Sequence, residues 1–253
     1  RVGERGKAAY RKLPGRGIDP ARFIGKKANM AAGIGIIFDC DGTLVDSMGA
    51  WHEVDRTLAA EAGIALTKAD TDAITTMSLD EASAYLHGQC GLGESTAAVK
   101  AMIFDRMRAF YANEVEARPG ALAFVRAMHE RGVPMAVASS TPPDMLATCI
   151  ERCGFAPYMQ AVVSVDDLQT SKREPLVYDH ARAALGTDRA RTWGFEDATY
   201  ALDTLRTAGY RTGAIYDNDL SGTREDLLAR ADFLISSWED LDPDDFLAKV
   251  TLS

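Results

Sequence analysis

Short apolar segments alternate with amphipathic ones along most of this 253-residue chain. The apolar segments predict buried strands and lie at residues 33–38, 134–139, 160–165, 191–195, 211–216 and 232–236. The amphipathic segments between them predict helices at 119–132, 142–154, 175–186 and 197–209. Three of these four begin at proline and all four end at glycine, which favours helices. The pattern predicts a doubly wound α/β fold with a mostly parallel sheet.

Residues 48–116 break this alternation and contain no strand-like segment. Four helices are predicted there, at residues 48–63, 67–77, 78–90 and 94–114. Ser78 and Glu81 have the spacing of a capping box at the start of the third. We therefore expect a smaller, all-helical domain inserted after the first strand, with residues 30–47 and 117–253 forming the α/β domain.

Composition and charge restrict the ligands that this chain can take. With 47% hydrophobic and 26% charged residues it is typical of a globular protein. No apolar run approaches the roughly 18 residues of a membrane-spanning helix. Residues 1–29 carry nine Lys or Arg against two acids, a net charge of +7, which leaves −16 for the remainder of a chain whose total is −9. So acidic a body repels nucleic acid and anionic membranes, which favours a small ligand.

The basic segment 1–29 lacks the apolar core of a secretory signal and is interpreted as a flexible extension, with a targeting or nucleic-acid-binding arm as the alternative. The four cysteines, Cys40, Cys90, Cys149 and Cys153, form no CxxC pair, so neither a disulfide framework nor a zinc site is expected. Cys149 and Cys153 have the spacing of one helix face and are expected in the core. These features favour a reducing, cytoplasmic location.

The strongest chemical signal is FDCDGTLVDS, residues 38–47. Because side chains alternate along a strand, Asp39 and Asp41 are expected on one side and Cys40 on the other. Two such carboxylates repel each other unless a cation or a shared proton compensates. No His or Cys cluster lies nearby, so an oxygen-liganded Mg²⁺ fits best. Gly42 permits a tight turn whose backbone N–H groups could face an anion.

Three further polar segments follow later in the chain: VASST at 137–141, SKREP at 171–175 and GFEDATYAL at 194–202. Each has an ordinary explanation when taken alone, as serine caps, a solvated Lys-Arg pair and an aspartate that caps a helix. Together they fall where ligands bind in open α/β sheets, at the carboxyl ends of the strands.

FDCDGTLVDS resembles the first motif of haloacid dehalogenase superfamily phosphatases, and the later segments are similar to that superfamily's other motifs in the same order. The resemblance runs from about Gly33 to the C-terminus. The helical insertion after the first motif is similar to that of phosphoglycolate phosphatase and β-phosphoglucomutase-like members. The resemblance implies an Mg²⁺-dependent phosphatase that hydrolyses a small phosphorylated metabolite through an aspartyl-phosphate.

The resemblance also implies roles for individual residues. Asp39 would be the nucleophile, and Asp41 the acid that protonates the leaving group and later activates water. Ser139 would hydrogen-bond the transferring phosphoryl group, and Lys172 would neutralise it and the nucleophile. Arg173 departs from the family's pattern, which has proline there, and this puts the rigidity of the loop in question.

The implied metal and phosphate contacts complete the set. Mg²⁺ would be held by Asp39, Asp41, Glu196 and Asp197. For Asp41 the implied contact is through its backbone carbonyl, and Glu196 would be a ligand or a neighbour of one. The phosphate would also be contacted at Gly42, Thr43 and Ser140.

The helical insertion resembles the family's mobile cap, which closes over the site and recognises the rest of the substrate. Trp51 and His52 lie closest to the first motif, although ordinary packing is the commoner role of such a tryptophan. The other cations of the insertion are more often solvated surface residues, and are Arg56, Lys68, His87, Lys100, Arg106 and Arg108.

Alternative functions share part of this pattern. A phosphomutase of the β-phosphoglucomutase type has all four motifs but returns the phosphoryl group to a sugar. A receiver-like phosphate-binding module lacks both the second aspartate and the insertion. A dehalogenase does not need Asp41, and phosphonate hydrolysis needs a cap lysine, for which only Lys68 and Lys100 are available. Phosphatase activity is therefore favoured.

Overall fold

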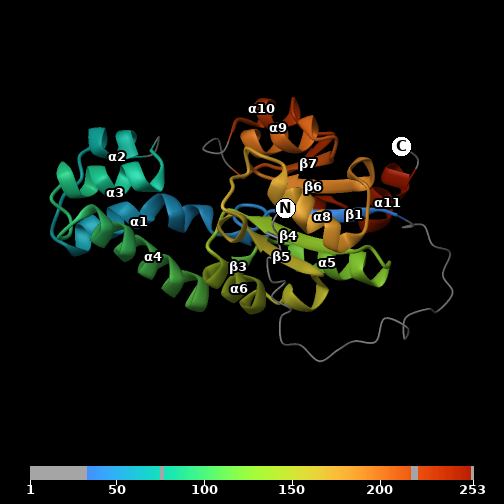
Figure 1. Ribbon diagram of the computed structural model, residues 1–253, viewed down its shortest axis with the longest axis horizontal. Coiled ribbons are helices and arrows are strands. Elements are labelled where there is room, and N and C mark those ends of the chain that lie inside the picture. The colour runs from blue at the N-terminus through green and yellow to red at the C-terminus, as the bar shows by residue number, and fades with distance from the viewer. Residues whose placement is uncertain (1–32, 75–76, 218–221, 252–253) are drawn as a thin grey trace, which may run out of the picture. The chain divides into compact units, whose positions relative to one another are not determined.

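The computed structural model describes residues 33–74, 77–217 and 222–251, so the predicted basic extension lies outside the described residues. The chain divides into two compact units (Figure 1). The first, which we call the core unit, is made of two segments of the chain, one that ends at Val45 and one that begins at Ala117. The helical unit runs from Asp46 to Glu116.

A six-stranded parallel sheet forms the centre of the core unit, with strand order β5-β4-β1-β6-β7-β8. Its strands are β1 Gly35–Phe38, β4 Met135–Ser139, β5 Ala161–Ser164, β6 Thr192–Glu196, β7 Arg211–Ile215 and β8 Phe233–Ile235. Phe38 lies opposite Val137 of β4 and Phe195 of β6. All six strands expected from the apolar segments are present. Strand β1 lies between β4, which ends in the VASST segment, and β6, which ends in the GFEDATYAL segment.

Helices alternate with these strands along the chain (Figure 1). They are α5 Ala121–Glu130, α6 Pro143–Arg152, α7 Val165–Leu168, α8 Leu176–Leu185, α9 Thr199–Thr207, α10 Arg224–Leu228 and α11 Pro243–Thr251, with short 3-10 turns η2 Ala156–Tyr158, η3 Arg189–Arg191 and η4 Trp238–Asp240. The four helices expected between strands are confirmed, and α10 and α11 were not predicted. Val165, expected at the end of a strand, instead begins α7, because the Ser164 hydroxyl caps that helix.

Both faces of the sheet are covered, as the doubly wound prediction requires. On one face Ile37 packs in a buried cluster with residues of α8. On the other, Phe38 stacks on Phe195 with ring centroids 5.6 Å apart and meets the edge of Trp238 at 5.6 Å. Full burial of each such side chain contributes roughly 1.5–3 kcal/mol. The Trp238 indole N–H also donates to the Thr43 carbonyl at 2.9 Å, which fastens the loop after β1 to the C-terminal segment.

The helical unit contains α1 Met48–Glu61, α2 Lys68–Ile74, α3 Leu79–Gly88 and α4 Thr96–Asn113. The predicted capping box is present, because the Ser78 hydroxyl accepts from the Glu81 N–H and the Glu81 carboxylate accepts from the Ser78 N–H. Trp51 of α1 donates its indole N–H to the Tyr111 hydroxyl of α4 at 2.9 Å. This hydrogen bond ties α1 to α4 and orients the indole of Trp51.

The two units are joined by short strands, β2 Val45–Asp46 and β3 Glu116–Ala117, which pair with each other.

All four cysteines are free thiols, as expected. Among the helices of the described residues, none combines the length and apolarity needed to cross a membrane.

Gly120 provides a test of the packing beneath the sheet. Its φ is +79°, and a Cβ there would lie 2.7 Å from the Glu239 backbone N. Gly132 has a similar φ of +75° with nothing within 4 Å of its Cβ position. We expect Gly132→Ala to reduce the free energy of unfolding by about 1 kcal/mol through backbone strain alone. Gly120→Ala should lose about 1–3 kcal/mol more, because backbone atoms must also move.

Urea unfolding of the two variants measures this difference. Equal losses for Gly120→Ala and Gly132→Ala would show that η4 does not pack against the start of α5 as described.

Candidate functional site

Three strands deliver polar residues to one edge of the sheet. Asp39 follows β1 directly, and its backbone N–H donates to the Phe195 carbonyl of β6 at 2.9 Å. Ser139 ends β4 and Glu196 ends β6. Because β1 lies between β4 and β6, the parallel register gathers these side chains at the carboxyl ends of the strands.

Lys172 links two of these acids in the interior of the core unit. Its ammonium donates to Asp39 Oδ1 and to Glu196 Oε1, the latter at 2.8 Å. All three side chains are almost wholly buried, at 4% exposure for Lys172, 6% for Asp39 and 1% for Glu196. One cation is therefore shared by two carboxylates that are almost wholly buried.

Burial and charge shift the pKa values of this group in a consistent way. Burial raises the pKa of Asp39 to about 7 although Lys172 opposes the shift, and it raises the pKa of Glu196 as well. Burial alone would lower the pKa of Lys172, but the charges of Asp39 and Glu196 raise it overall, so the amine stays protonated. The neighbouring carboxylates add to the effect of burial, since the charge of Glu196 raises the pKa of Asp39 and that of Asp197 raises the pKa of Glu196.

A divalent cation fits this excess of charge. Asp39, Glu196 and Asp197 each offer a carboxylate oxygen, and these three atoms lie within 4.8 Å of one another. Glu196 Oε2 is buried and has no hydrogen-bond partner. A set of carboxylate oxygens without nitrogen or sulfur donors suits Mg²⁺.

Asp197 had an alternative interpretation as a helix cap. In the structure, Ala198 occupies the cap position of α9, and no side-chain cap is present there. Asp197 is buried at 6% exposure beside Glu196. Asp197 is therefore not the N-cap residue of α9.

Asp41 lies outside that carboxylate group and is held by the loop after β4. The Thr141 hydroxyl donates to Asp41 Oδ2. The Thr141 N–H in turn donates to Ser139 Oγ at 3.0 Å, and the Ser164 hydroxyl donates to the Thr141 carbonyl at 2.7 Å. Thr141 was missed from the sequence, although it lies within the VASST segment. The loop thereby fixes the orientation of Asp41 relative to Ser139.

The loop after Asp39 is closed by hydrogen bonds between its own backbone groups. Gly42 makes the expected turn with a φ of +75°. Its N–H donates to the Val45 carbonyl at 3.0 Å, however, and the Thr43 N–H donates to the Cys40 carbonyl at 3.3 Å. These two N–H groups close the loop, and contact of the phosphate at Gly42 and Thr43 stays a prediction. Ser140, the third predicted phosphate contact, is exposed.

Cys40 points away from the acids, as the strand pattern predicted. Its sulfur is buried 3.7 Å from the Cys149 sulfur. The hydrogen bond to Cys149 lowers the pKa of Cys40, but burial and the neighbouring aspartates outweigh it and raise the value to about 11. Cys40 is therefore a protonated thiol of the core.

Two contacts around Lys172 were not foreseen. The Tyr178 hydroxyl, from α8, donates to Glu196 Oε1 at 2.7 Å, and burial together with the Glu196 charge raises the pKa of Tyr178 well above its usual value. The Arg173 guanidinium lies 4.7 Å from the centre of the Tyr200 ring, at the start of α9. This cation–π contact secures the loop at the position where the family has a proline.

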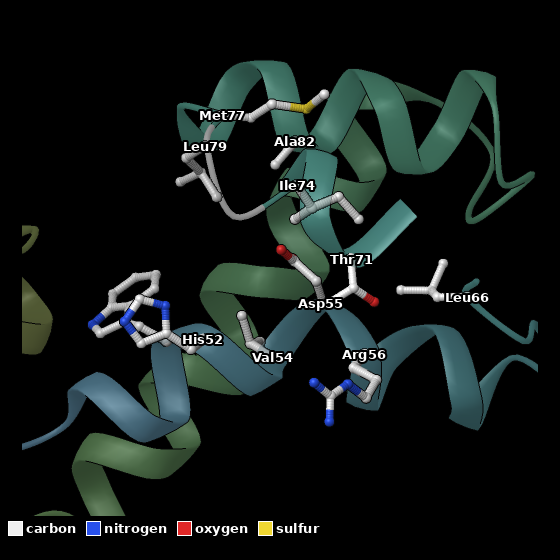
Figure 2. Close-up of a pocket in the computed structure, with 11 residues that line it drawn as sticks. His52, Val54, Asp55, Arg56, Leu66, Thr71, Ile74, Met77, Leu79 and Ala82 are labelled. Carbon is white, nitrogen blue, oxygen red and sulfur yellow. The ribbon is translucent and has the colours of Figure 1, made fainter. Parts of the chain in front are cut away.

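The helical unit contains a pocket of its own, with a volume of about 220 Å³ (Figure 2). Figure 2 shows the Asp55 carboxylate pointing from α1 toward Ile74 of α2. Asp55 Oδ1 is buried without a hydrogen-bond partner, and burial raises the pKa of Asp55. The lining residues are Trp51, His52, Val54, Asp55, Arg56, Leu66, Thr71, Ile74, Met77, Leu79 and Ala82.

Most cations of the helical unit are paired within it. The ion pairs are Arg56–Glu53, Lys68–Asp72, Lys100–Asp80, Arg106–Glu61 and Arg108–Asp105. His87 has a ring nitrogen 3.1 Å from the Leu92 carbonyl. Two of the candidates considered from the sequence, His52 and Arg56, line the pocket. Arg56 is paired with Glu53.

Comparison with known proteins gives consistent matches. A family model described as haloacid dehalogenase-like hydrolase matches residues 35–209. A phosphoglycolate phosphatase from Rhodobacter capsulatus is 28% identical, over 69% of this chain and 80% of its own length. A fructose-1-phosphate phosphatase from Escherichia coli is also 28% identical, over 69% of this chain and 92% of its own.

A solved structure shows the same fold. The β-phosphoglucomutase from Clostridium difficile superposes with a TM-score of 0.64 at 16% identity, covering 86% of this chain and 97% of its own. At that identity the likeness concerns the fold alone.

The shared cation gives a test of the site's electrostatics. Lys172→Met removes the ammonium and leaves Asp39 and Glu196 buried without it, so we expect a loss of about 3–5 kcal/mol in the free energy of unfolding. Lys68→Met, which removes an exposed amine paired with Asp72, should stay close to wild type. Urea unfolding in EDTA measures both variants, and a Lys172→Met variant as stable as Lys68→Met would contradict the buried ion pairs.

Proposed function

This chain belongs to the haloacid dehalogenase-like hydrolase family, and from that premise we propose that it is an Mg²⁺-dependent phosphatase acting through an aspartyl-phosphate on Asp39. The family resemblance of the sequence motifs is thereby confirmed. The expected enzyme class, a phosphoric monoester hydrolase, is confirmed by the family together with relatives that are phosphatases. The observation that carries the mechanism is the buried group of Asp39, Lys172, Glu196 and Asp197.

Asp39 is the proposed nucleophile. Its carboxylate oxygen forms a bond to phosphorus as the bond from phosphorus to the ester oxygen breaks. Water then attacks the phosphorus of the aspartyl-phosphate, which releases inorganic phosphate and restores the carboxylate. The position of Asp39 supports this role, because it lies at the end of a buried strand with its backbone fixed by β6.

Asp41 is the proposed acid and base of the two steps. It gives a proton to the departing ester oxygen and takes one from the attacking water. Its hydrogen bond with Thr141 supports the assignment, since a proton donor must be held in a defined direction. Ser139, in the same loop, would hydrogen-bond the phosphoryl group, with the Ser140 backbone beside it.

Asp39, Glu196 and Asp197 would hold Mg²⁺, with the Asp41 carbonyl as a further contact. The bound ion would offset the charge on the phosphoryl oxygens. Lys172 adds a second positive charge beside Asp39, and thereby reduces repulsion between the nucleophile and an anionic substrate.

Residues 48–116 are the proposed cap, and 30–47 with 117–253 the proposed catalytic domain. We propose that the helical unit recognises the organic part of the substrate. Its pocket supports this, because His52 and Asp55 can hydrogen-bond hydroxyl groups. The relatives act on a phosphorylated acid and a phosphorylated sugar, which supports a small phosphorylated metabolite as the substrate class.

A phosphomutase is the alternative, and the fold that it shares with a β-phosphoglucomutase is the observation in its favour. Incubation with a panel of sugar phosphates, phosphoglycolate and nucleotides separates the two. A phosphatase releases inorganic phosphate from its substrate, whereas a phosphomutase yields an isomeric sugar phosphate without net release. A receiver-like module would give neither product.

The nucleophile assignment predicts the behaviour of Asp39→Asn. An amide is a far poorer nucleophile, so the hydrolysis of p-nitrophenyl phosphate should fall by about 10⁴-fold or more. Asp203→Asn, which neutralises an exposed acid paired with Arg230, serves as the control and should retain wild-type activity. Omission of Mg²⁺ in EDTA should also abolish activity in the wild type. Near-normal turnover by Asp39→Asn would contradict the mechanism.

A further inference from the structure

Glu196 is held unevenly by its neighbours. Both hydrogen bonds to its carboxylate fall on one oxygen, Oε1, which accepts from the Tyr178 hydroxyl at 2.7 Å and from the Lys172 ammonium at 2.8 Å. The other oxygen, Oε2, is buried and has no hydrogen-bond partner. A buried carboxylate oxygen without a partner is costly, so its persistence calls for a ligand.

The torsion that turns a glutamate carboxylate is broad and therefore needs external restraint. Two donors on Oε1 provide it, because rotation of the carboxylate would break both bonds. One carboxylate oxygen of Glu196 lies within 4.8 Å of those of Asp39 and Asp197, and Oε2 is the oxygen that no donor occupies. We propose that Tyr178 is a positioning residue that fixes Glu196 so that Oε2 is presented to the metal ion.

The chemistry of the tyrosine suits this role. Lys172 divides its ammonium between Glu196 and Asp39, so it is not a donor to Glu196 alone. The phenol supplies a second donor without adding positive charge, so it orients the carboxylate without repelling a cation. Tyr178 itself is fixed on α8, where its ring is 1% exposed in the buried cluster that includes Ile37.

The chain offers a matched control in Tyr210. Its ring lies 6.3 Å from that of Tyr178 and is 4% exposed, and its hydroxyl donates to Asp179 Oδ1 at 2.6 Å. Tyr178→Phe and Tyr210→Phe thus each remove one hydroxyl that bonds a carboxylate in the same region of the core. Only the first of these carboxylates belongs to the acid cluster.

The test measures metal binding in the absence of substrate. The full chain is stripped of metal and titrated with Mn²⁺, and the free ion is followed by electron paramagnetic resonance. We expect Tyr178→Phe to weaken Mn²⁺ binding by about tenfold. Tyr210→Phe should bind as the wild type does. The Mg²⁺ concentration that half-activates p-nitrophenyl phosphate hydrolysis should rise in parallel for Tyr178→Phe, with kcat largely recovered at saturating Mg²⁺.

A double variant tests whether Tyr178 acts through Glu196. In a Glu196→Gln background, removal of the Tyr178 hydroxyl should change Mn²⁺ affinity much less than it does in the wild type. A full additional loss would overturn the proposal, and so would equal Mn²⁺ affinities for Tyr178→Phe and wild type or an equal weakening by both tyrosine variants. If Tyr178→Phe lacks a cooperative unfolding transition, Tyr178→Met provides the same titration with a flexible apolar side chain.

The inference rests on the proposed metal site, but its failure is distinguishable from failure of the proposed function. If the wild-type chain binds Mn²⁺ but hydrolyses no phosphate ester, the proposed phosphatase function is wrong. The Mn²⁺ titration of Tyr178→Phe then still tests the role of Tyr178. A wild-type chain that hydrolyses phosphate esters without binding Mn²⁺ overturns the role of Tyr178.

Discussion

Burial of three carboxylates beside one ammonium is the constraint that organises the core unit. Asp39, Glu196 and Asp197 bring three carboxyl groups to an almost wholly buried place, and Lys172 supplies one positive charge in return. Charges buried in this way are strongly unfavourable unless they are paired. The three acidic side chains outnumber the single ammonium, which explains why the arrangement suits a divalent cation. With that cation bound, the site also suits an anionic substrate.

The fold supplies the rigidity that this arrangement needs. Adjacent parallel strands set the spacing of Asp39 and Glu196, and the aromatic cluster under Phe38 fastens the loop after β1 through Trp238. On the opposite face of the sheet, α8 brings Tyr178 to Glu196. Each face of the sheet thus contributes one contact that holds a part of the site in place. Mutations in the core are therefore expected to affect the site by changing the orientation of its side chains.

Much of this could be predicted from the sequence because it is local. Apolar segments set the strands, and the alternation of side chains after β1 placed Cys40 in the core. Tyr178 and Thr141 could not be predicted, since their partners lie 18 and 100 residues away and depend on how α8 and the loop after β4 pack. The hydrogen bond from the Gly42 N–H to the Val45 carbonyl could not be predicted either, because it depends on how the loop closes. Short polar helices such as α10 carry too little apolar pattern to be recognised.

The central claim is that Asp39 carries the phosphoryl group during turnover. Acid quenching during steady-state hydrolysis, followed by borohydride reduction, converts an aspartyl-phosphate to homoserine, which mass spectrometry of the digested protein locates. The account predicts homoserine at position 39 when both substrate and Mg²⁺ are present, and none when either is withheld. Homoserine at another position, or phosphate release without any modified residue, would contradict it.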